Sequence, residues 1–246
     1  MHNYKMTIAY DGTRYSGWQK QSENPLKTIQ GKLEHILSLL FEEEIQVIAS
    51  GRTDAGVHAN NQVANFQAKA YKKPQEILDY VAKYVSNDIA ITELKGASER
   101  FHARYNCKFK MYSYTIDTGL FPNPFTARYA YHFNESLNIE NMKEAASHLL
   151  GTHDFQSFTS MKSKKKPTVR TLTDIDIQVE GSSIIIYYRG DGFLQHMVRI
   201  LTGTLIEVGT GKRLASDMPH LLEAKKRSES GYTVPPHGLC LQKVDY

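Results

Sequence analysis

In the first part of the chain, apolar residues recur either at every second position or at the spacing of a helix face. Alternation of period two, or short apolar runs, predict strands at residues 4–10, 45–50, 61–68 and 88–94. Apolar residues at helical spacing predict helices at residues 29–41 and 74–85, and Pro74 suits the first turn of the second one. The resulting order, βαββαβ, is the ferredoxin-like pattern.

The second part of the chain repeats this order. Strands are predicted at residues 108–116, 171–180, 183–189 and 238–246, and helices at residues 138–150, 193–208 and 215–225. No linker rich in Pro, Gly or Ser separates the two parts. We therefore predict an α+β fold with two ferredoxin-like halves, residues 1–105 and 106–246. The halves are expected to join into one mostly antiparallel sheet with helices on one face and a central catalytic cleft.

Composition places the chain among ordinary globular proteins. Its 246 residues are 41% hydrophobic and 23% charged, which excludes extensive disorder and collagen-like repeats. No apolar stretch is long enough to cross a bilayer, and the polar N-terminus lacks a secretory signal, so we expect a cytoplasmic protein without a membrane partner. Cys107 and Cys240 show no CxxC spacing, which argues against a zinc cluster and a disulfide framework.

The formal net charge of +4 is too small to identify a nucleic-acid partner by itself. Positive charge gathers in three short runs, at residues 72–73, 162–167 and 225–227. Each run lies beside a predicted element boundary, so a solvated loop is the simplest interpretation. Contact with phosphate is the alternative.

The segment GRTDAGVHA, residues 51–59, connects two predicted strands of the first half. A turn needs only Asn, Asp and Gly, so Arg52 and His58 are not explained by the turn alone. Ala55 and Gly56 are small enough to let a substrate approach the backbone beside Asp54. The alternative is that Asp54 merely caps a turn.

The predicted helix at residues 193–208 carries an arginine on its less apolar side. On a helical wheel, His196, Arg199 and Gly203 share a narrow stripe away from the broad apolar face, and Gly203 would let another segment approach closely. Arg199 is an ordinary surface residue if this stripe meets water. If the stripe is covered, its guanidinium needs a carboxylate, and Asp54 is the candidate. An aspartate held by arginine stays ionised, which suits a nucleophile or a base.

Other chemistries find less support. The ten histidines include no HExxH or paired-His spacing, and GTGKR does not fit a phosphate-binding P-loop, so neither a metal nor a nucleotide cofactor is expected. Lys110, Tyr112 and Tyr114 share one face of the strand at residues 108–116. These tyrosines either cover a core or offer a flat ring to a base.

Several motifs together resemble the tRNA pseudouridine synthase A family over essentially the whole chain. They are, in order, YDGTRYSGWQ, GRTDAGVHA, FHARY followed by MYSYTI, GTHDF, GFLQHMVRILTG and PPHGLCL. One departure is visible, because Ser86 and Asn87 stand where the family usually carries Leu-Pro. It touches a predicted helix exit rather than the candidate chemistry.

The resemblance implies a cofactor-independent isomerase that converts uridine to pseudouridine in the anticodon stem-loop of tRNA, usually as a homodimer. It also implies residue roles. Asp54 would be the catalytic residue, and Arg199 would pair with it. Tyr112 would stack on the target base, and Arg52 would help to hold the nucleotide out of the stem.

The reaction explains these residue types. Uracil must leave C1′ of its ribose and rebond through C5, after the nucleotide has been flipped out of the stem. Asp54 could attack C1′ or remove a proton from C2′, and the sequence leaves both routes open. His58 either shapes the loop or contacts phosphate. Phosphate contact is also the hypothesis for the lysines of the basic run, Lys164, Lys165 and Lys166.

Two other functions stay open at this level. A non-catalytic RNA-binding protein could use the same pair of ferredoxin-like sheets. A carboxylate-dependent glycosidase would need a second carboxylate near Asp54, for which Asp11 is the one available candidate.

Overall fold

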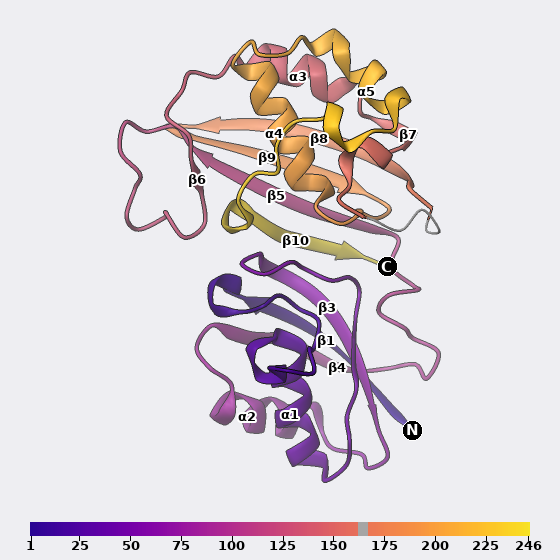
Figure 1. Cartoon of the computed structure of the whole chain (residues 1–246). Helices are drawn as coiled ribbons and strands as arrows, with labels where there is room; N and C mark the ends of the chain where they lie inside the picture. The colour runs from indigo at the N-terminus through magenta and orange to yellow at the C-terminus, as the bar shows by residue number, and fades with distance from the viewer. Residues whose placement is uncertain (162–166) are drawn as a thin grey trace. The chain divides into compact units, whose positions relative to one another are not determined.

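A computed structural model describes residues 1–161 and 167–246 (Figure 1). The chain divides into two compact units. Unit 1 comprises Met1–Lys108 and Cys240–Tyr246, and unit 2 comprises Phe109–Leu239. Ten strands and five α-helices lie in the described residues, and most strand pairs are antiparallel. The predicted α+β class is therefore confirmed, while the domain limits 1–105 and 106–246 stay a prediction.

Unit 1 has the predicted order βαββαβ. Its elements are β1 (His2–Tyr10), α1 (Ile29–Phe41), β2 (Val47–Ala49), β3 (His58–Ala68), α2 (Pro74–Tyr84) and β4 (Ile89–Ala97). β1 is central and pairs antiparallel with β3 and β4. The other edge of β3 is shared by β2, which pairs antiparallel, and by the last strand, β10 (Leu239–Asp245), which pairs parallel.

Helices α1 and α2 lie side by side over one face of the unit 1 sheet (Figure 1). Tyr4 and Met6 alternate along β1 toward this face and are buried, and the Tyr4 ring stacks on Phe66 at 5.0 Å. α1 begins where the Thr28 hydroxyl accepts a hydrogen bond from the Gly31 N–H, which satisfies one of the helix's first amides. The helix ends at Glu42, which adopts the left-handed conformation.

Unit 2 has a four-stranded antiparallel sheet in the order β5-β9-β8-β7, with β6 beside β5. Its elements are β5 (Phe109–Asp117), β6 (Tyr131–His132), α3 (Ile139–Ser147), β7 (Gly151–Asp154), β8 (Val169–Glu180), β9 (Ser183–Gly190), α4 (Met197–Gly209) and α5 (Met218–Ala224). α3 and α4 pack together over one face of this sheet (Figure 1). The buried side chains of Ile184, Ile186 and Tyr188 on β9 form its core side.

The remaining regular elements are short 3-10 helices. They span Gly12–Arg14, Pro25–Lys27, Gln156–Phe158, Ala215–Asp217, Arg227–Glu229 and Pro236–Gly238. Among the described residues, no helix has the length and apolar character that crossing a membrane requires.

Several element boundaries differ from the prediction, and two of them bear on the candidate site. β3 begins at His58 rather than at residue 61, because Ala59 pairs with Tyr10 and with Leu241. His58 therefore lies in a strand and not in the preceding loop. α4 begins at Met197 rather than at residue 193, because His196 has φ 61° and cannot continue a right-handed helix.

Candidate active site

Asp54 opens a tight turn between β2 and β3. Its carbonyl accepts a hydrogen bond from the Val57 N–H at 3.2 Å, and Gly56 at the third position of the turn has φ +77°. This conformation favours glycine, as in a type II turn. Asp54 is half-buried and the following Ala55 is exposed. The turn thus presents the aspartate at a fixed position beside an open, small residue.

The segment from Gly12 to Trp18 supports this turn. The Trp18 N–H donates to the Thr53 carbonyl at 3.0 Å, and the Tyr10 and Thr53 hydroxyls lie 2.8 Å apart. Gly17 packs so closely that a Cβ there would lie 2.7 Å from the Thr53 carbonyl oxygen. The backbone immediately before Asp54 is therefore held on both sides.

His58 contacts the same segment. Its side chain is buried, and Nδ1 lies 3.1 Å from the Gly12 N and 3.2 Å from a carboxylate oxygen of Asp11. A single ring nitrogen either accepts from the amide or donates to the carboxylate, so the two contacts are alternatives. Both favour the loop-shaping interpretation of His58. Its predicted contact with substrate stays a prediction.

Arg52 lies two residues before Asp54 on the same connection and is exposed. Its predicted role in holding the nucleotide out of the stem stays a prediction. The basic-run residues Lys164, Lys165 and Lys166 lie outside the described residues.

Tyr112 lies on β5 of unit 2 and is 7% exposed. Its ring meets that of Phe193 edge to face, with centroids 5.1 Å apart and an interplanar angle of 82°. Tyr114, two residues further on the same face, is fully buried and donates to the Pro235 carbonyl at 2.8 Å. Tyr114 therefore covers the core, and Tyr112 is also buried, with its ring against Phe193.

Arg199 lies on α4 of unit 2 and is half-buried. Its Nε donates to the Val234 carbonyl at 2.8 Å, and the Val234 N–H lies 3.3 Å from the Arg199 carbonyl. The close approach predicted at Gly203 is confirmed, since a Cβ there would lie 1.9 Å from the Tyr232 carbonyl oxygen. The stripe is thus covered by residues 231–234, which the sequence did not identify as its partner. The pairing of Arg199 with Asp54 stays a prediction.

Residues 227–234 are held against α4 by a network that sequence reasoning missed. The Arg227 guanidinium donates to the carbonyls of Ser230 and Gly231 and to the Thr233 hydroxyl. The Gly231 N–H donates to the Thr204 hydroxyl at 3.0 Å. These contacts fix the carbonyl that orients Arg199. The small residues Ser230 and Gly231 were the available signal for a close approach.

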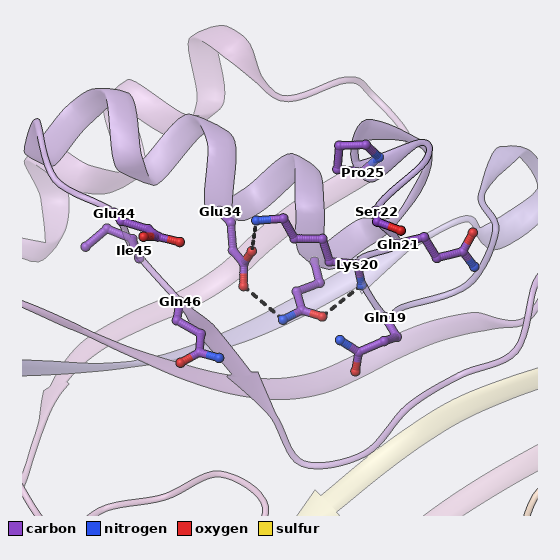
Figure 2. A pocket seen from close by; sticks show the side chains of 10 residues that line it. Gln19, Lys20, Gln21, Ser22, Pro25, Glu34, Glu44, Ile45 and Gln46 are labelled. Carbon is purple, nitrogen blue, oxygen red and sulfur yellow. Dashed lines mark hydrogen bonds and ion pairs between the residues drawn. The ribbon is translucent and has the colours of Figure 1, made fainter.

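A hollow of about 610 Å³ lies between the Gln19–Ser22 segment, α1 and residues 44–46, which precede β2 in unit 1 (Figure 2). Its buried carboxylate, Glu34, accepts hydrogen bonds from the Gln30 side chain at 2.9 Å and the Val47 N–H at 3.0 Å, and pairs with Lys20 at 3.0 Å. Asp54 does not line this hollow. Glu34 is thus committed to fixing β2 and Lys20, and is not a second carboxylate for Asp54.

The described residues contain no group of three or more His, Cys, Asp or Glu side chains arranged to hold a metal ion. Some tyrosines of unit 2 are buried in its core, among them Tyr114 and Tyr188. Burial raises the pKa of Tyr114, and the positive charge of Arg199 opposes that shift. The positive charge of Arg199 therefore acts on Tyr114 of β5.

Comparison with known proteins gives matches over the whole chain. A family model described as tRNA pseudouridine synthase matches residues 6–106 and 145–246. A tRNA pseudouridine synthase A 1 from Clostridium tetani is 48% identical over 246 residues, covering 100% of both chains. Proteins named tRNA pseudouridine synthase A 2 from Bacillus cereus and Bacillus anthracis are 46% and 45% identical, again over 100% of both chains.

Proposed function

Because this chain belongs to the tRNA pseudouridine synthase family, it isomerises uridine to pseudouridine in tRNA, and we propose that it acts on the anticodon stem-loop through Asp54. The observation that carries the proposal is the turn of Asp54. A half-buried carboxylate stands in a glycine turn whose backbone is fixed by Trp18 and Gly17. Such preorganisation is what a single catalytic carboxylate requires.

The reaction is an internal rearrangement. The bond between uracil N1 and ribose C1′ breaks, the bond between C5 and C1′ forms, C5 loses its proton and N1 ends protonated. Asp54 serves this exchange either as the nucleophile at C1′ or as the base that takes a proton from C2′. No oxidant, reductant or cofactor is needed for the balance.

The other residues have roles around the base. Tyr112, oriented by Phe193, stacks on the flipped uracil, and Arg52 fills the place that the nucleotide leaves. Arg199, oriented by Val234, pairs with the Asp54 carboxylate. His58 is proposed to fix the loop through Gly12, with phosphate contact as the alternative. Lys164, Lys165 and Lys166 are proposed to contact phosphate.

The test replaces the carboxylate alone. The Asp54→Asn variant should bind tRNA with wild-type affinity and form no pseudouridine, measured by chromatography of nucleosides from digested tRNA. Asp79→Asn changes an exposed aspartate of α2 in the same unit and should leave the product unchanged. Product formed at the wild-type rate by Asp54→Asn would refute the role of Asp54. Deuterium at C2′ separates the two routes, since only proton removal gives a primary isotope effect.

Mapping of pseudouridine in tRNA from cells with and without this protein tests whether the protein acts on the anticodon stem-loop. The sites that disappear should lie in that stem-loop.

We also propose a homodimer in the cytoplasm, as the sequence resemblance implies. Light scattering should give twice the 28.0 kDa chain mass. A monomer mass that persists with tRNA bound would contradict the dimer.

A further inference from the structure

The segment that leaves β4, residues 98–108, combines positive charge with aromatic rings. Arg100, Arg104 and Lys108 are exposed, and residues 100–108 contain no Asp or Glu. Phe101, His102 and Tyr105 lie between these cations. Basic side chains interleaved with aromatic rings are the composition of surfaces that bind single-stranded nucleic acid.

Two buried asparagines hold the backbone of this irregular segment. Asn3 donates to the carbonyls of Ser98 and Phe101 at 2.8 and 2.9 Å. Asn65 accepts from the Ala103 N–H at 2.8 Å and donates to Asn3 at 3.0 Å. A buried side-chain amide lowers the stability of the fold unless its polar atoms form hydrogen bonds. Here the side chains of Asn3 and Asn65 form hydrogen bonds with the backbone of this one loop. The loop is therefore a fixed part of unit 1.

The C-terminal residue adds a second anchor. The Tyr246 hydroxyl donates to the Ala103 carbonyl at 2.8 Å, and its ring lies 5.1 Å from that of Phe101. The Lys5 ammonium stands over both rings, 4.2 Å from Tyr246 and 5.1 Å from Phe101. Asn3 and Lys5 alternate on β1 with Tyr4 and Met6, which face the helices. The segment thus lies on the sheet face that α1 and α2 leave open.

Tyr105 is the most prominent side chain of the segment. It is 79% exposed, yet its ring stacks on His102 with centroids 4.1 Å apart and an interplanar angle of 28°. His102 Nδ1 accepts from the backbone N–H groups of Arg104 and Tyr105, and the backbone N–H of His102 donates to the Asn106 side-chain oxygen at 2.7 Å. One face of the Tyr105 ring is supported by His102, and the exposed remainder is available to a partner.

We propose that Tyr105 is a stacking platform for a nucleobase of the tRNA other than the target uridine, with Arg104, Arg100 and Lys108 contacting the flanking phosphates. This inference rests on the proposed function. Asn65, which holds the segment, lies seven residues along β3 from His58, about 23 Å at roughly 3.3 Å per residue. That separation from the Asp54 turn is too great for Tyr105 to receive the same base.

The preordered ring favours a base over a protein partner. A nucleobase needs one flat, rigid face and neighbouring cations for its phosphates, and residues 100–108 supply both without an acidic residue among them. The ordering of Tyr105 by His102 also means that little side-chain entropy is lost on binding. A protein partner is the competing outcome, and it would leave tRNA affinity unchanged when Tyr105 is replaced.

The test compares tRNA affinity of three variants with that of the wild type, using unmodified tRNA transcript. Tyr105→Ala should raise Kd by roughly 5- to 100-fold, as for loss of one stacked base. Tyr105→Phe keeps the ring and should bind within about twofold of wild type. Tyr84→Ala removes a tyrosine of similar exposure, 62%, at the end of α2, and should bind as wild type. All four proteins should unfold at the same temperature, since both tyrosines are exposed.

Charge and kinetics give separate readouts. Arg104→Gln should reduce the slope of log K against log salt by about one. Tyr105→Ala should raise KM and leave kcat unchanged, because the platform binds away from the reacting base. An unchanged Kd for Tyr105→Ala would overturn the inference while leaving the role of Asp54 intact. Conversely, pseudouridine formed by Asp54→Asn would refute the proposed mechanism without altering the Kd comparison at Tyr105.

Discussion

Gly12 packs directly against the backbone of Val57. A Cβ at position 12 would lie 2.0 Å from the Val57 carbonyl oxygen, and the Gly12 N–H lies 3.1 Å from His58 Nδ1. Val57 closes the turn that begins at Asp54. The first loop of the chain is therefore part of the support of the candidate catalytic carboxylate, and a single methyl group is enough to disturb it.

The Gly12→Ala variant should lose both stability and activity. The added methyl meets backbone, which cannot rotate away, so we expect a loss of about 2 kcal/mol in the free energy of unfolding. The rate of pseudouridine formation should fall at least tenfold, roughly the effect of a 1 Å displacement of a catalytic group. Urea unfolding and single-turnover kinetics measure the two effects. Gly96→Ala, where no atom lies within 4 Å of the new Cβ, is the matched control.

Phe193 sets the orientation of the Tyr112 ring. Edge-to-face contacts of this kind are worth about 0.5–1.5 kcal/mol, so Phe193→Ala should lower kcat by roughly 2- to 10-fold. Phe121→Ala removes a phenylalanine that is 79% exposed in the same unit and should leave kcat unchanged. Wild-type kcat in Phe193→Ala would show that the contact does not serve the base-stacking role proposed for Tyr112.

Asp117 fixes the turn that follows β5. Its two carboxylate oxygens accept the N–H groups of Gly119 and Asn123, each at 3.0 Å, and the side chain is buried. An asparagine offers one acceptor oxygen and therefore leaves one of these amides unsatisfied. We expect Asp117→Asn to cost about 1–3 kcal/mol in the free energy of unfolding at pH 7. Asp176→Asn, at an exposed carboxylate of β8, is the control.

The same carboxylate makes stability depend on pH. Hydrogen bonds from the Asn123 and Gly119 N–H groups lower the pKa of Asp117 from its ordinary value of 3.8. A pKa lowered by folding contributes stability above the unfolded value and loses it as pH falls through the folded value. The difference in stability between wild type and Asp117→Asn should thus be constant above about pH 5 and shrink below about pH 4. A difference that grows on acidification would contradict this assignment.

Periodicity predicted the long elements well because their patterns are local. The helix limits 29–41 match α1, where Thr28 caps the start. Strands β6 and β7 were missed, since two and four residues are too few to show alternation. The predicted start of α4 was wrong because the surroundings of His196 set its left-handed conformation, which cannot be inferred from the residue type alone.

Some features of the candidate site could likewise be predicted from the sequence, and others could not. The close approach at Gly203 was predicted from residue type and is confirmed, because a glycine within a helix needs an explanation. The catalytic role of Asp54 was also inferred from residue type, and it stays a prediction. The partners of Arg199 and Tyr112 were not predicted, since Val234 and Phe193 make contacts that depend on how unit 2 folds. The sequence suggested which side chains could carry the chemistry, and the tertiary structure shows contacts that orient Arg199 and Tyr112.

Gly203 offers the sharpest test of the support of Arg199, because two effects of opposite sign compete. Alanine inside a helix is more stabilising than glycine by about 0.5–1 kcal/mol when there is space for it. Here the new Cβ would lie 1.9 Å from the Tyr232 carbonyl oxygen, so residues 231–234 or α4 must move. We expect the steric effect to win and Gly203→Ala to lose at least 2 kcal/mol in the free energy of unfolding.

The displacement of residues 231–234 in Gly203→Ala should also lower the rate of the reaction. Val234 accepts the Arg199 Nε–H, so a shift of residues 231–234 moves the guanidinium and should lower the rate of pseudouridine formation at least tenfold. Urea unfolding and single-turnover kinetics with saturating tRNA give both numbers. Gly96→Ala again adds a methyl where nothing is near. Increased stability in Gly203→Ala would mean that residues 231–234 move without a loss in the free energy of unfolding. It would also mean that other contacts orient Arg199.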